Sequence, residues 1–326
     1  LDLDITAGVF QALKKLPVPQ FEGSNSWVIA PNKTKSGKVI LANDPHISYA
    51  QPSVWYEAHI STPTYEKYGY HMAGGPFPML AHDRNVAYGL TMFENDDIDF
   101  YLEQTNPADT TQYKTEKGWE NYEYVTKKIK VKDAEPVNFT IRKTRHGPLV
   151  NNVAKQINGD TPIAMSWIYT QKKNRVLDAV FEMSHAKNLE EFEDALPKIH
   201  APGLNVMYGD VEGNVAWWAT AQLYQMPDSV STKMVMDGTS GKNEPVRYLD
   251  FSENPSAINP PWDYVYSANN QPDSIAGMLY PGYYLPENRA MRIVQLLENK
   301  DDWDRESTSQ MILDATSLVN PALVAE

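Results

Sequence analysis

The stretch GSNSWVIA, residues 23–30, is where the character of this 326-residue chain changes. Before it, KLPVPQFEG contains two prolines and a glycine, a composition typical of an extended linker. After it, Trp27–Ile29 and Lys38–Ala42 are short β-branched runs, and the turn-rich PNKTKSG joins them. The pattern predicts a β-hairpin with Ser24 at the start of its first strand.

Outside this hairpin, glycine- and proline-rich connections such as AGGPFP separate further short runs. They predict strands at residues 54–60, 66–72, 85–91, 100–104, 122–131, 137–143, 204–208 and 215–219. Helical spacing of apolar residues predicts helices at residues 5–15, 175–183, 189–199, 290–298 and 307–318. Asn188 is a candidate N-cap, and Ser307 with Gln310 fits a capping box. Strands with helices at both ends favour an α+β layered sandwich.

Composition excludes several classes of function. The 29 basic and 42 acidic side chains give a net charge of −13, which disfavours nucleic acid and anionic membrane surfaces as partners. The chain has no cysteine, so disulfides, thiolate catalysis and zinc sites built on cysteine are excluded. Residues 1–15 have the pattern of neither a signal peptide nor a membrane span.

Familiar catalytic motifs are absent from the sequence. It contains no GxSxG elbow and no HExxH pair, the seven histidines lie in unrelated contexts, and GYHMAGG lacks the GxGxxG spacing. Taken alone, GSNSW is more typical of a turn before a strand than of a nucleophile. The interpretation of Ser24 therefore depends on the sequence that follows it.

That sequence resembles the penicillin acylase family. The matching blocks are SNSWVIA at 24–30, LANDPH at 41–46, PFPMLAHDRNVAYGLT at 76–91, DDIDFYLEQ at 96–104, TRHGPLV at 144–150, NVMYGDVEGNVAWW at 205–218, YSANNQP at 266–272 and ENRAMRIVQLL at 287–297. The resemblance implies a four-layer αββα sandwich of the N-terminal nucleophile hydrolases, here only partly represented, without the α chain and the C-terminal part of the β chain. It also implies that residues 1–23 are a spacer and residues 24–326 the N-terminal portion of the β chain.

The resemblance implies a mechanism for these residues. Cleavage between Gly23 and Ser24 would make Ser24 an N-terminal nucleophile whose own α-amine acts as its base, because an α-amine has a pKa of about 7.7–8.0. His46 takes the place beside the nucleophile, and the Met92 backbone N–H and the Asn205 amide would stabilise the oxyanion. Without the resemblance, His46 would be a packed strand-end histidine, Met92 a core residue and Asn205 a turn residue.

Other positions carry binding roles by the same resemblance. Ile47, Leu80 and Leu90 would line an aliphatic acyl pocket, which does not identify the substrate. Where penicillin G acylases have an arginine that anchors the site, this chain has Ser229, so that charge must come from elsewhere or is absent.

A calcium ion is also implied, although a solvated acidic loop is an equal alternative. Its ligands would be the carboxylates of Asp96 and Asp99 and the carbonyl of Ile98. The site could be incomplete, because some of the family's ligands come from the α chain.

The leading functional hypothesis is an amidohydrolase, periplasmic or secreted, that pairs with its α chain. Its substrates would be N-acyl amides: β-lactam side chains, acyl-homoserine lactones or acylated amino acids. Two alternatives stay open. One is a catalytically silent family member that binds acylated ligands or peptides, and the other is a carbohydrate-binding module suggested by Trp217-Trp218 and the tyrosine clusters.

Overall fold

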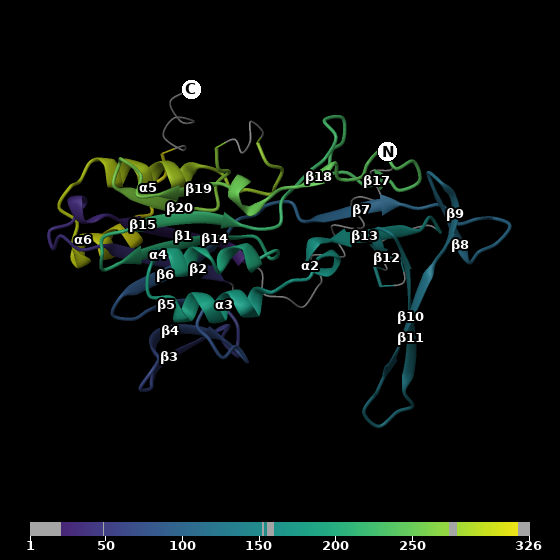
Figure 1. Cartoon of the computed structure of the whole chain (residues 1–326), viewed down its shortest axis with the longest axis horizontal. Helices are drawn as coiled ribbons and strands as arrows, with labels where there is room; N and C mark the ends of the chain where they lie inside the picture. Colours follow the sequence, from purple (N-terminus) through teal and green to yellow (C-terminus); the bar gives the residue numbers. More distant parts are fainter. Residues whose placement is uncertain (1–20, 48, 152, 155–159, 274–278, 319–326) are drawn as a thin grey trace. The chain divides into compact units, whose positions relative to one another are not determined.

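The computed structural model describes residues 21–47, 49–151, 153–154, 160–273 and 279–318 (Figure 1). The predicted helix at 5–15 and most of the linker lie outside these residues. Contacts divide the described chain into two compact units, a division that the sequence analysis does not anticipate. The smaller unit comprises residues 96–173 and 223–249, and the larger unit comprises residues 21–95, 174–222 and 250–318. The predicted boundary between residues 23 and 24 stays a prediction.

The predicted hairpin forms part of a three-stranded antiparallel sheet in the larger unit. Its strands are β1 (Phe21–Ile29), β2 (Ile40–Ile47) and β20 (Tyr264–Ser267), in the order β2-β1-β20. The prediction that Ser24 begins the strand is wrong, because Phe21 and Gly23 already pair with Ile47 and His46 across an irregularity in the register. Ser24 therefore lies inside β1, where backbone pairing fixes its position.

A seven-stranded sheet forms the second layer of the larger unit, in the order β19-β15-β14-β6-β5-β4-β3. Its strands are β3 (Trp55–Ser61), β4 (Glu66–Met72), β5 (Leu80–His82), β6 (Val86–Met92), β14 (Leu204–Asp210), β15 (Val215–Thr220) and β19 (Ser256–Ile258). Successive residues of β14 face opposite sides: Met207 packs with Val28 of β1, whereas Val206 packs with Phe192. One face of this sheet thus meets the three-stranded sheet and the other meets helices.

Helices cover the two outer faces of the larger unit. Helix α3 (Val176–His185), α4 (Leu189–Glu193) and the 3-10 turn η2 (Leu196–Lys198) pack on the seven-stranded sheet, and α5 (Asn288–Glu298) and α6 (Arg305–Ile312) pack on the three-stranded sheet. In Figure 1, α5 and α3 lie on opposite sides of the strands. The larger unit is therefore layered as helix, sheet, sheet, helix.

Two predicted helix boundaries need correction. The helix predicted at 189–199 ends at Glu193, because Pro197 has no N–H for an α-helical bond and disfavours helical geometry at Leu196. The capping box predicted at Ser307 and Gln310 is also wrong: Asp304 is the N-cap and accepts a hydrogen bond from Ser307 N. The predicted cap at Asn188 is confirmed, since its side chain accepts from Glu191 N.

The smaller unit is built from short strands. They are β7 (Ile98–Leu102), β8 (Gln112–Thr115), β9 (Gly118–Asn121), β10 (Glu123–Ile129), β11 (Val137–Thr144), β12 (Gly147–Pro148), β13 (Ile163–Trp167), β16 (Tyr224–Gln225), β17 (Met236–Asp237) and β18 (Arg247–Tyr248). A short helix, α2 (Ile168–Gln171), follows β13. The predicted pairing of residues 122–131 with 137–143 is confirmed by the β10-β11 hairpin. No helix in the described part of the chain is long and apolar enough to cross a membrane.

Candidate active site

Ser24 is buried inside the larger unit, with 2% of its surface exposed. Its hydroxyl donates a hydrogen bond to the carbonyl oxygen of Gly23 at 2.6 Å, and its backbone N–H donates to Oδ1 of Asn269 at 2.5 Å. The hydroxyl therefore lies beside the peptide bond that joins Gly23 to Ser24, and the nitrogen of that bond is held by a side chain.

Gly23 is needed where it stands for two reasons. Its φ of +148° is a conformation that side chains rarely adopt, and a Cβ atom there would lie 3.1 Å from Nη2 of Arg289 and 3.1 Å from Cδ1 of Leu285. A glycine is the residue that satisfies both constraints. The irregularity of β1 at Gly23 and the closeness of Arg289 are thus linked.

Asn269 and Arg289 hold Ser24 from the side of β20 and α5. Asn269 is fully buried in the left-handed region at φ 60°, and its Nδ2 donates to the Met92 carbonyl at 2.8 Å. Arg289 donates to the Ser24 carbonyl at 2.8 Å and to Oδ1 of Asn269 at 3.0 Å. Burial lowers the pKa of Arg289, and the carboxylates of Asp44 and Glu94 oppose that shift. Arg289 thus places a positive charge beside Ser24.

The structure brings Asn205 and Met92 into the same network. Nδ2 of Asn205 donates to the Met92 carbonyl at 3.0 Å and to Oγ1 of Thr91 at 3.1 Å, while its Oδ1 accepts from Nε1 of Trp217 at 2.9 Å. The Met92 carbonyl therefore joins Asn205 to Asn269, which contacts Ser24. Two residues, Met92 and Asn269, thus lie between Asn205 and Ser24 in this network.

His46 lies opposite Gly23 in the β1-β2 register. Its Nε2 is 3.0 Å from Oδ2 of Asp44, and about a third of each side chain is exposed (36% and 35%). Among the described residues, no hydrogen bond joins His46 to Ser24. Its predicted action on the serine hydroxyl stays a prediction.

The three predicted acyl-pocket residues differ in how deeply they are buried. Leu80 and Leu90 are each 8% exposed and belong to the apolar cluster between the seven-stranded sheet and α3, which Met92 also contacts. Ile47 is half-buried at the end of β2. Leu90 pairs with Val206 and shares its helix-facing side of the sheet, so the predicted role of Leu80 and Leu90 in an acyl pocket stays a prediction.

The acidic run lies in the smaller unit. Asp96 and Asp99 are 2% and 4% exposed, so the alternative of a solvated acidic loop is wrong. Burial raises the pKa of Asp97 to about 6 and that of Asp99 to about 7. Oδ2 of Asp96 and Oδ1 of Asp99 are buried without a hydrogen-bond partner. The described residues contain no group of three or more His, Cys, Asp or Glu that could hold a metal.

Comparison with known proteins places this geometry in a family. A model of the penicillin amidase family matches residues 3–326. The chain belongs to the penicillin amidase family. An acyl-homoserine lactone acylase of Pseudomonas aeruginosa is 31% identical over 96% of this chain. Penicillin G acylase of Escherichia coli is 27% identical over 85% of the chain, and penicillin acylase 2 proenzyme of a Pseudomonas species is 28% identical over 84%.

A solved structure shares the fold of this penicillin amidase family member. Thermostable penicillin G acylase from Alcaligenes faecalis matches it with a TM-score of 0.76 and 24% identity, over 88% of this chain and 51% of that chain. The chain spans 38% of the length of the acyl-homoserine lactone acylase, 32% of penicillin G acylase of Escherichia coli and 35% of penicillin acylase 2 proenzyme. It therefore corresponds to part of each of them.

Asn269 and Arg289 are the two site residues that the sequence analysis misses. A signal was available, because Asn269 lies in YSANNQP and Arg289 in ENRAMRIVQLL, two of the blocks that carry the family resemblance. Neither block reveals by itself that its residue reaches Ser24, which is 245 positions away from Asn269. Only the pairing of β20 with β1 brings them together.

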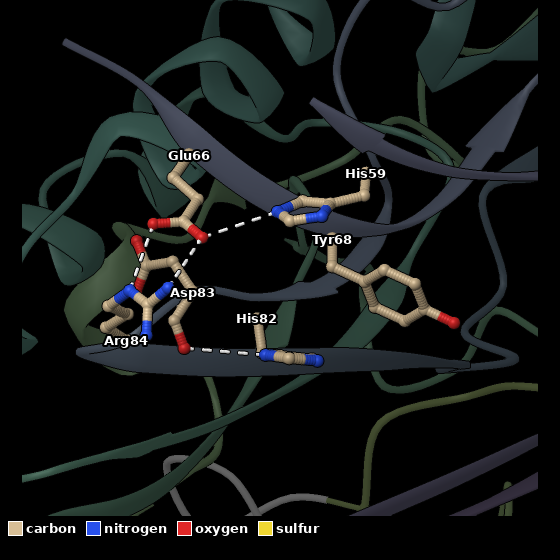
Figure 2. A pocket seen from close by; sticks show the side chains of 6 residues that line it. All are labelled: His59, Glu66, Tyr68, His82, Asp83 and Arg84. Carbon is tan, nitrogen blue, oxygen red and sulfur yellow. Dashed lines mark hydrogen bonds and ion pairs between the residues drawn. The ribbon is translucent and has the colours of Figure 1, made fainter. Parts of the chain in front are cut away.

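A separate hollow lies on β3, β4 and β5, at the edge of the seven-stranded sheet (Figure 2). It has a volume of about 600 Å³ and is lined by His59, Glu66, Tyr68, His82, Asp83 and Arg84. Figure 2 shows Glu66 between His59 at 3.3 Å and the Arg84 guanidinium at 3.2 Å. Glu66 and Arg84 pair with each other, Asp83 pairs with Lys67 outside the lining, and none of these groups belongs to the network at Ser24.

Proposed function

We propose that this chain is part of an amidohydrolase that cleaves the amide bond of N-acyl substrates with Ser24 as its N-terminal nucleophile. The observation that carries the proposal is the position of Ser24: its hydroxyl is 2.6 Å from the Gly23 carbonyl oxygen, and its nitrogen is held by Asn269. The same serine can then act twice, first on its own chain and afterwards on substrate.

In the first reaction the Ser24 hydroxyl attacks the Gly23 carbonyl carbon. A C–O bond forms, the C–N bond breaks, and the hydroxyl proton passes to the Ser24 nitrogen, which leaves an ester. Water then hydrolyses the ester to a Gly23 carboxylate and a free Ser24 with its α-amine. Asn269 and Arg289 fix the groups on both sides of Ser24 during this rearrangement, since they hold its nitrogen and its carbonyl.

In turnover the neutral α-amine accepts the proton of the Ser24 hydroxyl as that oxygen attacks the substrate carbonyl, directly or through one water. The Met92 N–H and the Asn205 amide are our candidates for donors to the oxyanion, and loss of one such donor typically costs about 10²–10³ in rate. The substrate amine then leaves with a proton, and water hydrolyses the acyl ester. We place His46 beside the nucleophile as a group that tunes its environment.

Several finer proposals accompany this function. The names of the relatives support acyl-homoserine lactones and penicillins as substrate classes, with N-acyl amino acids as a third. Ile47, Leu80 and Leu90 would line the acyl side, and an α chain from the same precursor would complete the site. We infer a periplasmic or secreted location from the family resemblance, and we interpret the helix-sheet-sheet-helix layering as the αββα sandwich of N-terminal nucleophile hydrolases.

The decisive experiment compares Ser24→Ala with Ser26→Ala in the precursor that carries this chain. Ser26 lies on the same strand, two residues on, and its buried hydroxyl donates to the Ala42 carbonyl, so it is a matched control. Intact mass and N-terminal sequencing should find a chain beginning at Ser24 in the wild type and in Ser26→Ala, and an uncut chain in Ser24→Ala. Amine release from a penicillin, an acyl-homoserine lactone and an N-acyl amino acid should follow the same pattern. A wild-type chain that stays uncut would favour a catalytically silent binding protein.

We also propose that Asp96, Asp99 and the Ile98 carbonyl contribute oxygen ligands to a calcium ion. The two orphaned, buried carboxylate oxygens fit a hard cation, although calcium takes 6–8 oxygens and the remainder must come from carbonyls, waters or groups outside the described residues. Calcium should raise the melting temperature of the wild type, and Asp96→Asn should remove most of that rise. If calcium has the same effect on both proteins, the site lies elsewhere.

A further inference from the structure

A cavity of about 660 Å³ opens in the larger unit between β15, β19, β20 and α5. This volume is in the range of small-molecule sites, about 300–1,000 Å³. Ser24, Asn269 and Arg289 do not line it, but Asn205, the candidate oxyanion donor, does, so the cavity borders the site of the proposed hydrolysis. Its back wall includes Asn205, which is 2% exposed.

The walls of this cavity carry negative charge. Glu253, Asp273 and Glu287 line it, and none of the lining residues is Lys, Arg or His. In the described part of the chain, Asp273 and Glu287 form no ion pair. Two carboxylates that face one cavity without a basic neighbour favour a cation over an anion or a neutral ligand.

Aromatic side chains form much of the rest of the wall. They are Trp217, Trp262, Tyr264 and Tyr266. Trp262 is 55% exposed, which leaves its ring available to a ligand. Burial raises the pKa of Tyr266, and the negative charges of Asp273 and Glu287 add to the rise. Carboxylates beside aromatic faces are the surroundings that an organic cation prefers.

Asn254 forms a fixed part of the wall. It is 7% exposed and lines the cavity, and its Nδ2 donates to the carbonyls of Ala219 at 3.0 Å and Ala221 at 2.9 Å. Its Oδ1 is closed off from solvent, so Asn254 shapes the cavity without offering that oxygen to a ligand.

We propose that this cavity binds a small organic ammonium ion with an aromatic or aliphatic body. The carboxylates of Asp273 and Glu287 select the charge, and the rings of Trp217, Trp262 and Tyr266 contact the body. The cavity shares its back wall with the Ser24 network, because Ser267 lines it and contacts Oγ1 of Thr91 at 2.7 Å. The binding itself does not depend on the proposed hydrolysis.

The test uses the full chain with Ser24→Ala, which keeps it uncut and inactive, so that binding is measured apart from catalysis. The probes are 2-phenylethylammonium and its neutral analogue 2-phenylethanol, followed by calorimetry and tryptophan fluorescence. We expect the ammonium ion to bind with a Kd on the order of 1 mM or tighter, and the alcohol at least about tenfold more weakly. Added salt should weaken the ammonium complex.

Variants locate the site. Glu287→Gln and Asp273→Asn should each raise the Kd of the ammonium ion about three- to tenfold, and Trp262→Ala should weaken both probes. The control is Glu306→Gln on α6, which removes the same charge outside the cavity and should leave the Kd unchanged. Far-ultraviolet circular dichroism checks that each variant is folded. Equal affinity for the two probes, or an ammonium Kd unaffected by both carboxylate variants, would overturn the proposal.

Discussion

At the scale of single residues, the site depends on a glycine that cannot be replaced without moving its neighbours. Gly23 combines a positive φ with close approach to Arg289 and Leu285, and its carbonyl receives the Ser24 hydroxyl. A side chain at this position would push the carbonyl away from the attacking oxygen, because the backbone would relax toward negative φ.

Gly23→Ala should therefore slow cleavage of the Gly23-Ser24 bond by roughly tenfold or more, since about 1–2 kcal/mol of strain is relieved by leaving the cleavage geometry. The rate is measured as the uncut fraction over time by mass spectrometry. Gly37→Ala is the control, because Gly37 also has a positive φ, +63°, but a Cβ there meets nothing within 4 Å. If the two variants are cut at the same rate, the packing around Gly23 is unimportant.

The same scale shows what sequence can and cannot identify. Ser24 stands out in the sequence because the whole order of blocks after it matches a family, and its role as nucleophile stays a prediction. The sequence does not show which of Asn205 and Asn269 contacts Ser24, because both are asparagines in matching blocks. Backbone geometry distinguishes them. Asn269 adopts φ 60° after β20 and so directs its Oδ1 to Ser24, whereas Asn205 lies within β14 and contacts Met92.

At the scale of strands, one side chain links the two sheets beside the site. Nδ2 of Asn43 donates to the carbonyls of Asn25 on β1 and Leu90 on β6, at 3.0 Å each, and its Oδ1 accepts from Leu90 N at 2.7 Å. β5 pairs with β6 only at Ala87 and Tyr88, so the Asn43 amide takes the place of a neighbouring strand at Leu90. A Cβ on Gly89 would lie 2.4 Å from Oδ1 of Asn43.

This arrangement predicts that Gly89 and Asn43 are energetically coupled. Gly89→Ala should lower the free energy of unfolding by about 1–3 kcal/mol because it overpacks the space against Asn43. Asn43→Ala should cost a similar amount, about 1–3 kcal/mol, because it leaves the Leu90 backbone groups unpaired. In the double variant the overpacking is relieved. Its loss of unfolding free energy, measured by urea unfolding, should therefore be clearly smaller than the sum of the two single losses. If the two losses simply add, Gly89 and Asn43 are not energetically coupled.

Strand and helix positions were predictable where one pattern acts over several residues. The hairpin of β10 and β11 follows from alternation, and the cap at Asn188 follows from its side chain. The boundaries that fail are those where a single residue overrides the pattern, as Pro197 does after α4 and Asp304 does before α6. A periodic apolar pattern continues through such residues and cannot show where hydrogen bonding stops.

At the scale of the whole molecule, the division into two units was not predictable, because residues 96–173 and 223–249 are separated in sequence and meet only through pairings such as β7 with β17. The smaller unit also buries ionisable groups at its centre. Nδ1 of His146 lies 2.7 Å from Oε1 of Glu103, its Nε2 lies 2.8 Å from Oε1 of Glu244, and its ring stacks on Tyr101 at 3.8 Å. Both ring nitrogens face carboxylates, which favours the charged imidazolium.

This histidine gives the smaller unit its own pH dependence. Burial alone would lower the pKa of His146, but its hydrogen bonds to Glu103 and Glu244 outweigh burial and raise it above 6.5. The folded unit thus holds the proton more tightly than the unfolded chain. Its stabilising contribution is complete below about pH 6.5 and is lost as the pH rises through the raised pKa, by about 1.4 kcal/mol for each unit of the rise.

Amide hydrogen exchange at β7 and β11 should therefore report a lower free energy of opening at pH 8.5 than at pH 6, after correction for intrinsic rates. His146→Gln should flatten this dependence, although the variant is less stable throughout because it leaves a buried carboxylate unpaired. Asp97 and Asp99 titrate in both proteins, and the charge of His146 lowers the pKa of Asp99, so the difference between the two profiles reports His146 together with its effect on Asp99. His82→Gln, at an exposed position of β5, is the control and should leave the profile of the smaller unit unchanged. If wild type and His146→Gln show the same slope, His146 gains no proton on folding.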